Sequence, residues 1–501
     1  MTAVATSERL PVAGAVTFGG TVTNAALAFL MTGIISNALG TTSTGLFFQA
    51  TALFAIIAAA LGMGADTALV RSLSRARALD RPHVLIPTVV VAFVPVLVVS
   101  IVVATAVWLA APTFAQIMNP AAPLEAQALI RGLAPFLPAA PMLGLTLGAC
   151  RGLGRYLPYT ALQSLLVPVS RVVLLLVVLS TSRDVELVVL AWAAPLVLAV
   201  LLGVPVLVRL LRQMARTGNP IADTDASHRA VARPFWSFAL PRGGSTLLER
   251  ALDWSGVLIV IALAGPADGG VYAVVTRVAS IGTLLEGAAR VVTGPKISHA
   301  LALGDLDAAR AIFADVTRLL VLGSWPLYSL LIVFAAPVLS LFGPGFSSGA
   351  PALAAISVAM MTATAVGMLQ SFLLMGGQSH WQLMNRGIQL LTLVGLCFLL
   401  VPRLGALGAA LAWVAAILVD ALLAGTQVFR RMGVRSSPRL IAVPCLTAVG
   451  VFGVGGWLVR LALGETVTAL VTSVLVCGAV YLAVCARWRR ELGITALLGQ
   501  Q

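Results

Sequence analysis

The chain has 501 residues, of which 59% are hydrophobic and only 10% charged, and its mean hydropathy is +1.02. About a quarter of the residues of an ordinary soluble domain are charged, so this composition excludes a soluble protein. The net charge is +14 at pH 7 and the five cysteines show no CxxC spacing, so we expect no disulfide or zinc framework. The composition predicts an all-α polytopic membrane protein.

Fourteen apolar runs, each long enough to cross a hydrocarbon core about 30 Å thick, follow one another along the chain. They lie at residues 12–39, 44–70, 84–110, 124–149, 156–181, 186–210, 235–263, 269–293, 310–337, 350–375, 384–402, 405–429, 439–461 and 466–486. The first run is too long for a signal peptide, so we expect it to be retained. An even number of spans places both termini on the same side of the membrane.

The distribution of basic residues predicts which side that is. Segments on the side of the termini carry 22 arginine and lysine residues, whereas the opposite loops carry only Arg183, Arg403 and Arg460. By the positive-inside rule, both termini are therefore expected in the cytoplasm. The positive charge is then a topology signal that also suits anionic lipid headgroups, and we expect no nucleic-acid partner.

An internal repeat relates the two halves of the chain. Gly40-TTST-Gly45-LFF matches Gly265-PADG-Gly270-VYA, and one shift of 225 residues fits both pairs of glycines. Continued without a gap, the shift superposes Arg71 on Lys296, Asp80 on Asp305, Gly152 on Gly377 and Tyr156 on Trp381. Because it spans six helices, an even number, the two copies have the same orientation in the membrane.

The repeat predicts two six-helix lobes followed by two added helices. The expected divisions are a first lobe at 1–210, a cytoplasmic inter-lobe loop at 211–234, a second lobe at 235–429, helices thirteen and fourteen at 439–486, and a cytoplasmic tail at 487–501. We expect the lobes to face each other across a central cavity.

Charged residues gather in the seventh and eighth predicted helices, although charge at the bilayer centre costs about 2.5–3.5 kcal/mol. Arg242, Glu249 and Asp253 have the spacing of one helix face, with Arg250 about a hundred degrees around it. The eighth helix carries Arg277, Glu286 and Arg290, the last two at an i, i+4 spacing that favours an ion pair. These residues either line a hydrated cavity or form a structural ion-pair network.

The deep Arg171 and Asp420 likewise predict either a cavity role or a structural ion pair. The predicted spans hold seven arginines and five acids, and planar guanidinium groups suit phosphate or pyrophosphate. Under the 225-residue shift Glu249 corresponds to Asn24, so the first lobe offers amides and hydroxyls that suit sugar.

Several functions are not expected from this chain. The only lysine, Lys296, lies in TGPKISHA, which is not a P-loop, so the chain is not its own ATPase. The four histidines are scattered and the outward loops are short, so we expect no metal site, no cofactor and no catalytic domain.

The sequence resembles the multidrug/oligosaccharidyl-lipid/polysaccharide exporter superfamily, and within it the Wzx-type oligosaccharide flippases. The resemblance rests on LGTTSTGLFFQATALF at 39–54, LGMGADTALVRSLSRA at 61–76, RGLGRYLPYTALQSLLVPVSRVVLLL at 151–176 and GVYAVVTRVASI at 270–281. The related lipid II flippases have an arginine in the first helix and a DAF-type motif, whereas this chain has STGLFFQA there and no arginine.

The resemblance implies an alternating-access flippase of a bacterial plasma membrane, which moves polyprenyl-pyrophosphate-linked oligosaccharide to the outer leaflet. Its substrate cavity would be formed by helices one, two, seven and eight, with Arg242, Glu249, Arg250, Asp253, Arg277, Glu286, Arg290 and Asn24 as the candidate site. Implied partners are membrane lipids, a coupling ion (H⁺ or Na⁺), and an envelope polymerase or glycosyltransferases. The alternatives are a lipid II flippase, a drug/cation antiporter of the same fold, and a non-transporting scaffold for envelope synthesis.

Overall fold

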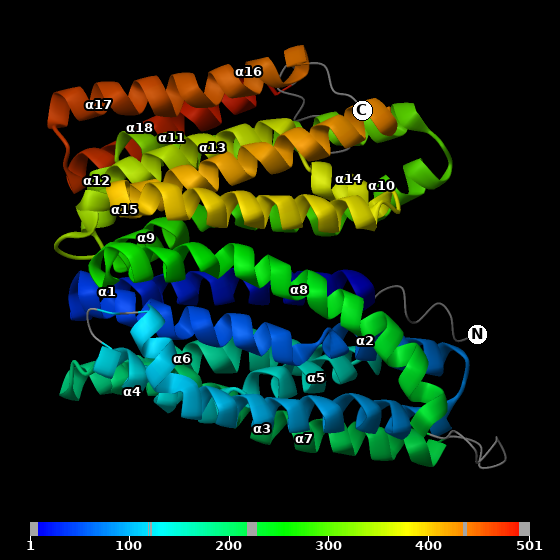
Figure 1. Cartoon of the computed structure of the whole chain (residues 1–501). Coiled ribbons are helices and arrows are strands. Elements are labelled where there is room, and N and C mark those ends of the chain that lie inside the picture. Colours follow the sequence, from blue (N-terminus) through cyan, green and yellow to red (C-terminus); the bar gives the residue numbers. More distant parts are fainter. Residues whose placement is uncertain (1–8, 119, 121–122, 218–227, 434–437, 490–501) are drawn as a thin grey trace. The chain divides into compact units, whose positions relative to one another are not determined.

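The computed structural model describes residues 9–118, 120, 123–217, 228–433 and 438–489, and within these ranges it contains helices and no strand (Figure 1). The all-α prediction is therefore confirmed. In chain order the α-helices are α1 (Arg9–Gly62), α2 (Ala65–Ala78), α3 (Leu85–Met118), α4 (Pro123–Leu133), α5 (Ala139–Gly152), α6 (Val167–Thr181), α7 (Val185–Thr217), α8 (His228–Ala264), α9 (Pro266–Ala279), α10 (Thr283–Ala302), α11 (Leu306–Val333), α12 (Ala335–Ser340), α13 (Ala350–Val366), α14 (Leu369–Met375), α15 (Ser379–Thr426), α16 (Pro438–Ala448), α17 (Gly455–Leu463) and α18 (Val467–Arg487).

Eleven helical segments among the described residues are long and apolar enough to cross a membrane. Two of them, Val22–Ala78 and His380–Arg430, each cover two predicted spans. The helix α8 is not among the eleven because charged residues interrupt its apolar sequence. The predicted count of fourteen is therefore not confirmed by this measure, and the seventh span stays a prediction.

Both of the double segments bend at a glycine. Gly40 in α1 has φ 75° and ψ −177°, and Gly405 in α15 has φ 54° and ψ −131°. Backbone of this kind is nearly restricted to glycine, because a side chain would collide with its own peptide groups. Each glycine thus ends one apolar helix and starts the next without an intervening loop.

The helices form two compact packing units. The first comprises the chain up to Leu39 together with Leu46–Leu258, and the second comprises Gly40–Gly45 together with the chain from Ile259. The boundary in α8 thus lies within a predicted span, whereas the predicted lobes divide at the loop 211–234. That loop is shorter than expected, because α7 continues to Thr217 and α8 begins at His228, and residues 218–227 lie outside the described residues.

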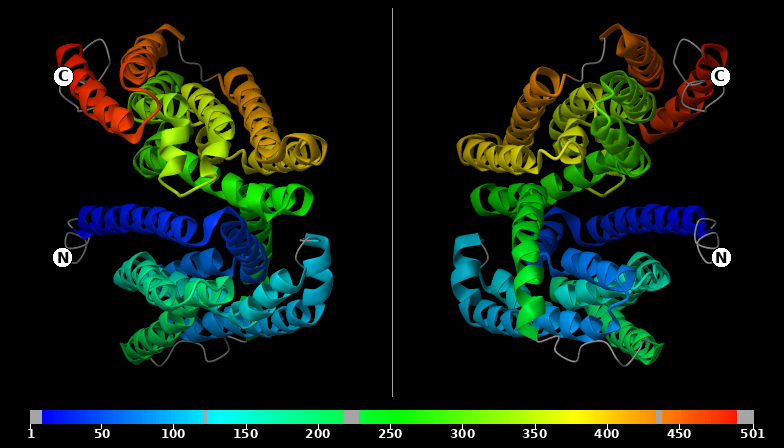
Figure 2. Two further views of the ribbon diagram at one scale, coloured as in Figure 1. Left: turned by 90° about the vertical axis from the view of Figure 1, so that its left-hand side faces the viewer. Right: turned by 90° about the vertical axis from the view of Figure 1, so that its right-hand side faces the viewer.

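Each unit has its own apolar core. In the first unit α2, α3, α5, α7 and α8 meet around residues such as Leu69, Leu145 and Phe235. In the second unit Phe313 of α11 and Phe372 of α14 pack edge to face, with ring centroids 5.2 Å apart. The C-terminal helices α16–α18 pack on α11 at the edge of their own unit (Figure 2). Of the predicted C-terminal tail, residues 490–501 lie outside the described part of the chain.

Helix ends in the two halves share the same backbone geometry, and they correct the register of the predicted repeat. At the end of α2, the Asp80 N–H donates to Arg77 O and the Arg81 N–H to Ala76 O. At the end of α10, the N–H groups of Gly304 and Asp305 make the same two bonds, to Leu301 and Ala300. Asp80 therefore corresponds to Gly304, and both have positive φ, of 51° and 69°.

The end of α5 shows a second change of register. There the Gly154 N–H donates to Arg151 O, and at the end of α14 the Gly377 N–H donates to Leu374 O in the same way. Gly377 is therefore the counterpart of Gly154, and not of Gly152 as the uninterrupted shift implies. The shift of 225 residues holds at Gly40 and Gly265, but the second copy loses a residue before each of these two helix ends.

The two copies of the glycine motif meet inside the second unit. A Cβ added to Gly45 would collide with the carbonyl oxygen of Pro266, and one added to Gly270 would collide with that of Thr41. Under the shift of 225 residues Thr41 corresponds to Pro266, so the contact is reciprocal. The close approach of the two backbones requires glycine at both positions.

We expect Gly45→Ala and Gly270→Ala each to lower the apparent Tm of the purified protein, by an effect of about 1–3 kcal/mol for each overpacked methyl. The control is Gly478→Ala in α18 of the same unit, where an added Cβ meets no atom within 4 Å. Fluorescence-detected size exclusion after heating measures all three variants. Wild-type Tm in both motif variants would contradict the assigned contact.

Candidate functional site

The charged stripe of α8 lies on the surface of the first unit. Arg242 Nη1 is 3.9 Å from Glu249 Oε1, and Arg250 Nη1 is 3.3 Å from Asp253 Oδ2. All four side chains are about half exposed, between 43% and 58%. The two ion pairs lie within one helix and are not buried, so they do not resemble a buried network that locks neighbouring helices together.

A close backbone contact holds α8 at the position of the stripe. A Cβ on Gly243 would overlap the backbone of Met63 and Gly64, and a Cβ on Gly64 would overlap Ala239 O and the Gly243 nitrogen. Gly64 precedes α2 and has φ 68°. The two glycines therefore bring α8 onto the junction of α1 and α2, and Arg242 stands directly beside this contact.

The predicted eighth helix is interrupted. It consists of α9, a single 3₁₀ turn at Ser280–Gly282 and α10. Arg277 is half-buried in the last turn of α9, whereas Glu286 and Arg290 lie on α10. Arg290 Nη2 donates to Glu286 Oε1 at 2.7 Å, which is the pair that the i, i+4 spacing predicts.

A second polar cluster lies on α14 and α15 of the same unit. Arg386 Nη1 donates to Gln389 Oε1 at 2.7 Å and stands 3.8 Å from Asp420 Oδ2. The amide of Gln370 donates to Asp420 Oδ1 at 2.7 Å. Asp420 is only 14% exposed and Arg386 30%, so this pair is better shielded than those on α8.

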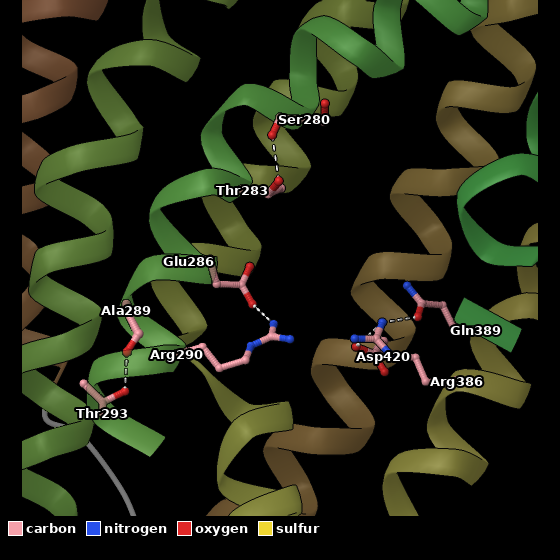
Figure 3. A network of polar contacts seen from close by, with 9 residues as sticks. All are labelled: Ser280, Thr283, Glu286, Ala289, Arg290, Thr293, Arg386, Gln389 and Asp420. Atoms are coloured by element: carbon pink, nitrogen blue, oxygen red, sulfur yellow. Dashed lines mark hydrogen bonds and ion pairs between the residues drawn. The ribbon is translucent and has the colours of Figure 1, made fainter. Parts of the chain in front are cut away.

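The pairs on α10 and α15 point toward one another. In Figure 3 the guanidinium of Arg290 and the carboxylate of Asp420 extend from their helices into the same space. Asp420 also experiences the charge of Glu286. The second unit thus holds two arginines and two acids in one polar region, with no excess of either sign.

A reciprocal amide pair joins the two arms of α15 on either side of its bend. Asn385 Nδ2 donates to Gln427 Oε1 at 2.8 Å, and Gln427 Nε2 donates back to Asn385 Oδ1 at 3.0 Å. Asn385 is fully buried. Because Arg386 and Asp420 also lie on opposite arms, the bend at Gly405 brings these four residues together.

The remaining candidates stand apart from these pairs. Arg171 of α6 lies over the Trp192 ring, 4.1 Å from its centroid, and its Nε donates to Trp192 O at 2.8 Å. Arg171 has no acidic partner within the described residues, so a cation–π contact and a carbonyl satisfy it in place of an ion pair. Asn24 is exposed on α1 of the first unit.

Sequence reasoning missed Arg386, Gln370, Gln389, Asn385 and Gln427. Arg386 was counted among the cytoplasmic arginines, but the structure places it on α15, paired with Asp420. The run Asn385-Arg386-Gly-Ile-Gln389 gave a signal, since three polar residues at the start of an apolar helix fall on adjacent turns. No cluster of metal-ligating residues occurs in the described parts of the chain.

We expect Arg386→Gln to lower the apparent Tm, because it leaves the shielded Asp420 carboxylate with Gln370 as its remaining partner. Asp420→Asn combined with Arg386→Gln should be less destabilising than the sum of the two single changes, with a coupling of about 0.5–3 kcal/mol. Asp307→Asn is the control, because Asp307 pairs with Arg310 at 92% exposure. Additive single effects would show that the pair does not interact.

Residues 13–299, more than half of the chain, match the family described as Polysaccharide biosynthesis protein. Among solved structures, the chain is similar to the lipid II flippase MurJ in an inward closed conformation, with TM-score 0.72, 11% identity, and coverage of 95% of this chain and 99% of that one. An inward-facing MATE family multidrug resistance transporter gives TM-score 0.61 and 17% identity over 82% of this chain and 94% of that one.

A transporter from Pyrococcus furiosus, also of the multidrug/oligosaccharidyl-lipid/polysaccharide exporter superfamily, gives TM-score 0.56 and 18% identity, with coverage of 84% and 96%. No curated protein matches the chain significantly. At these identities the solved structures show the fold alone. The family match and the fold agree with the resemblance expected from the sequence. The chain therefore belongs to the polysaccharide biosynthesis protein family and has the fold of this exporter superfamily.

Proposed function

We propose that this protein is a flippase that moves a polyprenyl-pyrophosphate-linked oligosaccharide from the inner to the outer leaflet of a bacterial plasma membrane. The observation that carries the proposal is the pair of half-exposed arginines, Arg242 and Arg250, in the middle of a helix of a membrane protein. Such charges in contact with lipid would be costly, so a hydrated path suits them better. The family to which the chain belongs supports a role in polysaccharide assembly.

The arrangement of α8 suits an anionic group that arrives and leaves. A guanidinium presents planar donors that match phosphate oxygens in pairs. Glu249 and Asp253 each hold an arginine in an exposed ion pair, and exposed pairs contribute only about 0–1 kcal/mol. A diphosphate can therefore displace the acids at small cost, and the acids neutralise the arginines again when the substrate has left.

The second unit supplies a different kind of group. Glu286 with Arg290 and Asp420 with Arg386 form a region without net charge, in which a proton or an alternative pairing can be exchanged. In this proposal that region couples transport to an ion gradient by alternating access, while α8 and Asn24 contact the substrate. Arg277 completes the set of substrate contacts.

The balance of charges separates the proposal from its rivals. A drug/cation antiporter is expected to place uncompensated acids in its path, whereas Glu249, Asp253, Glu286 and Asp420 all lie beside an arginine. Arginine-paired acids also distinguish the chain from a protein that acts only as a scaffold, which has no need for half-exposed charges within a span. The lipid II flippase is a rival for the same chemistry, and the glycan tells the two apart.

The transport prediction concerns the glycan carrier in the native host. Depletion of the protein should raise polyprenyl-pyrophosphate glycans in the cytoplasmic leaflet, and wild-type protein should restore their normal level. Arg250→Ala at matched membrane abundance should fail to restore it, with a residual rate lowered about tenfold or more, because a charge-assisted contact to phosphate is lost. Mass spectrometry of the extracted lipids identifies the glycan.

The matched control is Arg403→Ala, which removes an exposed arginine that lies outside the candidate site. It should complement as wild type does. If depletion leaves lipid-linked glycans unchanged, the flippase proposal fails. If the accumulated lipid is the peptidoglycan precursor, the protein is a lipid II flippase, and if Arg250→Ala complements fully, the α8 arginine does not contact substrate.

The topology prediction follows from the distribution of arginines, which places both termini in the cytoplasm. A fluorescent protein fused after Gln501 should fluoresce, and alkaline phosphatase at the same position should be inactive. Fusions after Arg183 should give the opposite result, because that segment is predicted on the outer side. Active phosphatase at the C-terminus would overturn the orientation and, with it, the direction of transport that we propose.

A further inference from the structure

A pocket of about 500 Å³, open to solvent, lies at the C-terminal end of α2 in the first unit. Its polar lining is Arg77, Asp80 and Arg81, and its apolar lining includes Leu85 of α3 and Met214 of α7. The volume falls within the range of about 300–1,000 Å³ that is usual for small-ligand sites. This pocket is separate from the charges on α8 and from the polar region of the second unit.

The two arginines of the pocket are not committed to other groups. Neither guanidinium has a hydrogen-bond or ion-pair partner in the part of the chain that the structure describes. Arg77 is nevertheless held in place, because its guanidinium lies against Gly154 and would collide with a Cβ there. Gly154 follows α5 with φ 78°, so the backbone of α5 positions the guanidinium of Arg77.

The internal repeat shows that the backbone does not require these arginines. The turn after α10 has the same hydrogen bonds as the turn after α2, and it places Leu301 at the position of Arg77 and Asp305 at that of Arg81. Leu301 packs against the apolar core of its unit, and Asp305 Oδ1 accepts from the Ala308 N–H to cap α11. The first unit builds the same turn with two unpaired cations, which serve no such structural purpose.

We propose that this pocket binds the phosphodiester group of a glycerophosphate headgroup. Two arginines and Asp80 give the polar lining a net charge of +1, which matches the single negative charge of a phosphodiester better than a phosphate dianion. Asp80 accepts a hydroxyl of the headgroup, and Leu85 and Met214 contact its apolar part. The surrounding segment from Arg71 to Arg81 is predicted to face the cytoplasmic leaflet, where anionic lipids gather.

The test measures binding of phosphatidylglycerol to the purified full chain by native mass spectrometry, with phosphatidylcholine as the zwitterionic comparison. We expect Arg77→Gln combined with Arg81→Gln to weaken phosphatidylglycerol binding about tenfold or more, because charge-assisted hydrogen bonds are lost. The matched control is Arg75→Gln on the same helix, an exposed arginine outside the pocket. It should bind phosphatidylglycerol as wild type does.

A second variant keeps every charge. Gly154→Ala displaces the guanidinium of Arg77 and should also weaken phosphatidylglycerol binding, which general attraction to a positive surface does not predict. Thermal unfolding of each variant verifies that the chain is folded. Equal binding by wild type and the double variant, or an equal loss in Arg75→Gln, would overturn the pocket.

Competition separates the two sources of the ligand. Soluble glycerophosphoglycerol that displaces the lipid identifies the headgroup alone as the ligand, and failure to displace it identifies the whole membrane lipid; both support the pocket. The assay measures no glycan transport. A negative result here therefore leaves the proposed flippase function untouched, and a failure of that function leaves this pocket intact.

Discussion

The cost of placing charge in hydrocarbon governs the arrangement of this protein. A membrane span tolerates an ionised group only if a partner, a π face or water compensates the lost hydration. All three solutions occur here: Asp420 has an arginine and an amide, Arg171 has the Trp192 ring and a carbonyl, and the α8 pairs have half-exposed surfaces. Where charge is shielded its partners are numerous, and where it is exposed the partners are few and weakly bound.

This difference assigns distinct roles to the charged groups. The cluster on α14 and α15 joins separate helical arms through several hydrogen bonds, so it fixes structure as well as charge. The α8 pairs join residues one or two turns apart on the same helix and fix nothing else. Groups that bind and release a substrate must be of the second kind, because a ligand cannot compete with a fully satisfied network.

The sequence predicted the fold class, the helical spans and the i, i+4 pair of Glu286 and Arg290, because these follow from composition and local periodicity. It did not predict the ion pair of Arg386 with Asp420, because the two residues are brought together by the bend at Gly405. The register of the repeat was also wrong beyond the first motif. Sequence matching extended one shift, whereas the positive φ of Asp80 and Gly304 shows where a residue is missing.

The contact of Gly45 with Pro266 and of Gly270 with Thr41 has the pattern of an isologous dimer interface, in which residue i of one subunit meets residue j of the other and j meets i. Two separate six-helix chains with this motif could form the same contact about a two-fold axis along the membrane normal. The glycines therefore preserve, within one polypeptide, the geometry of a homodimer. Once the copies were fused, each half was free to acquire its own charges, which is why α8 is acidic and basic where the corresponding part of α1 is not.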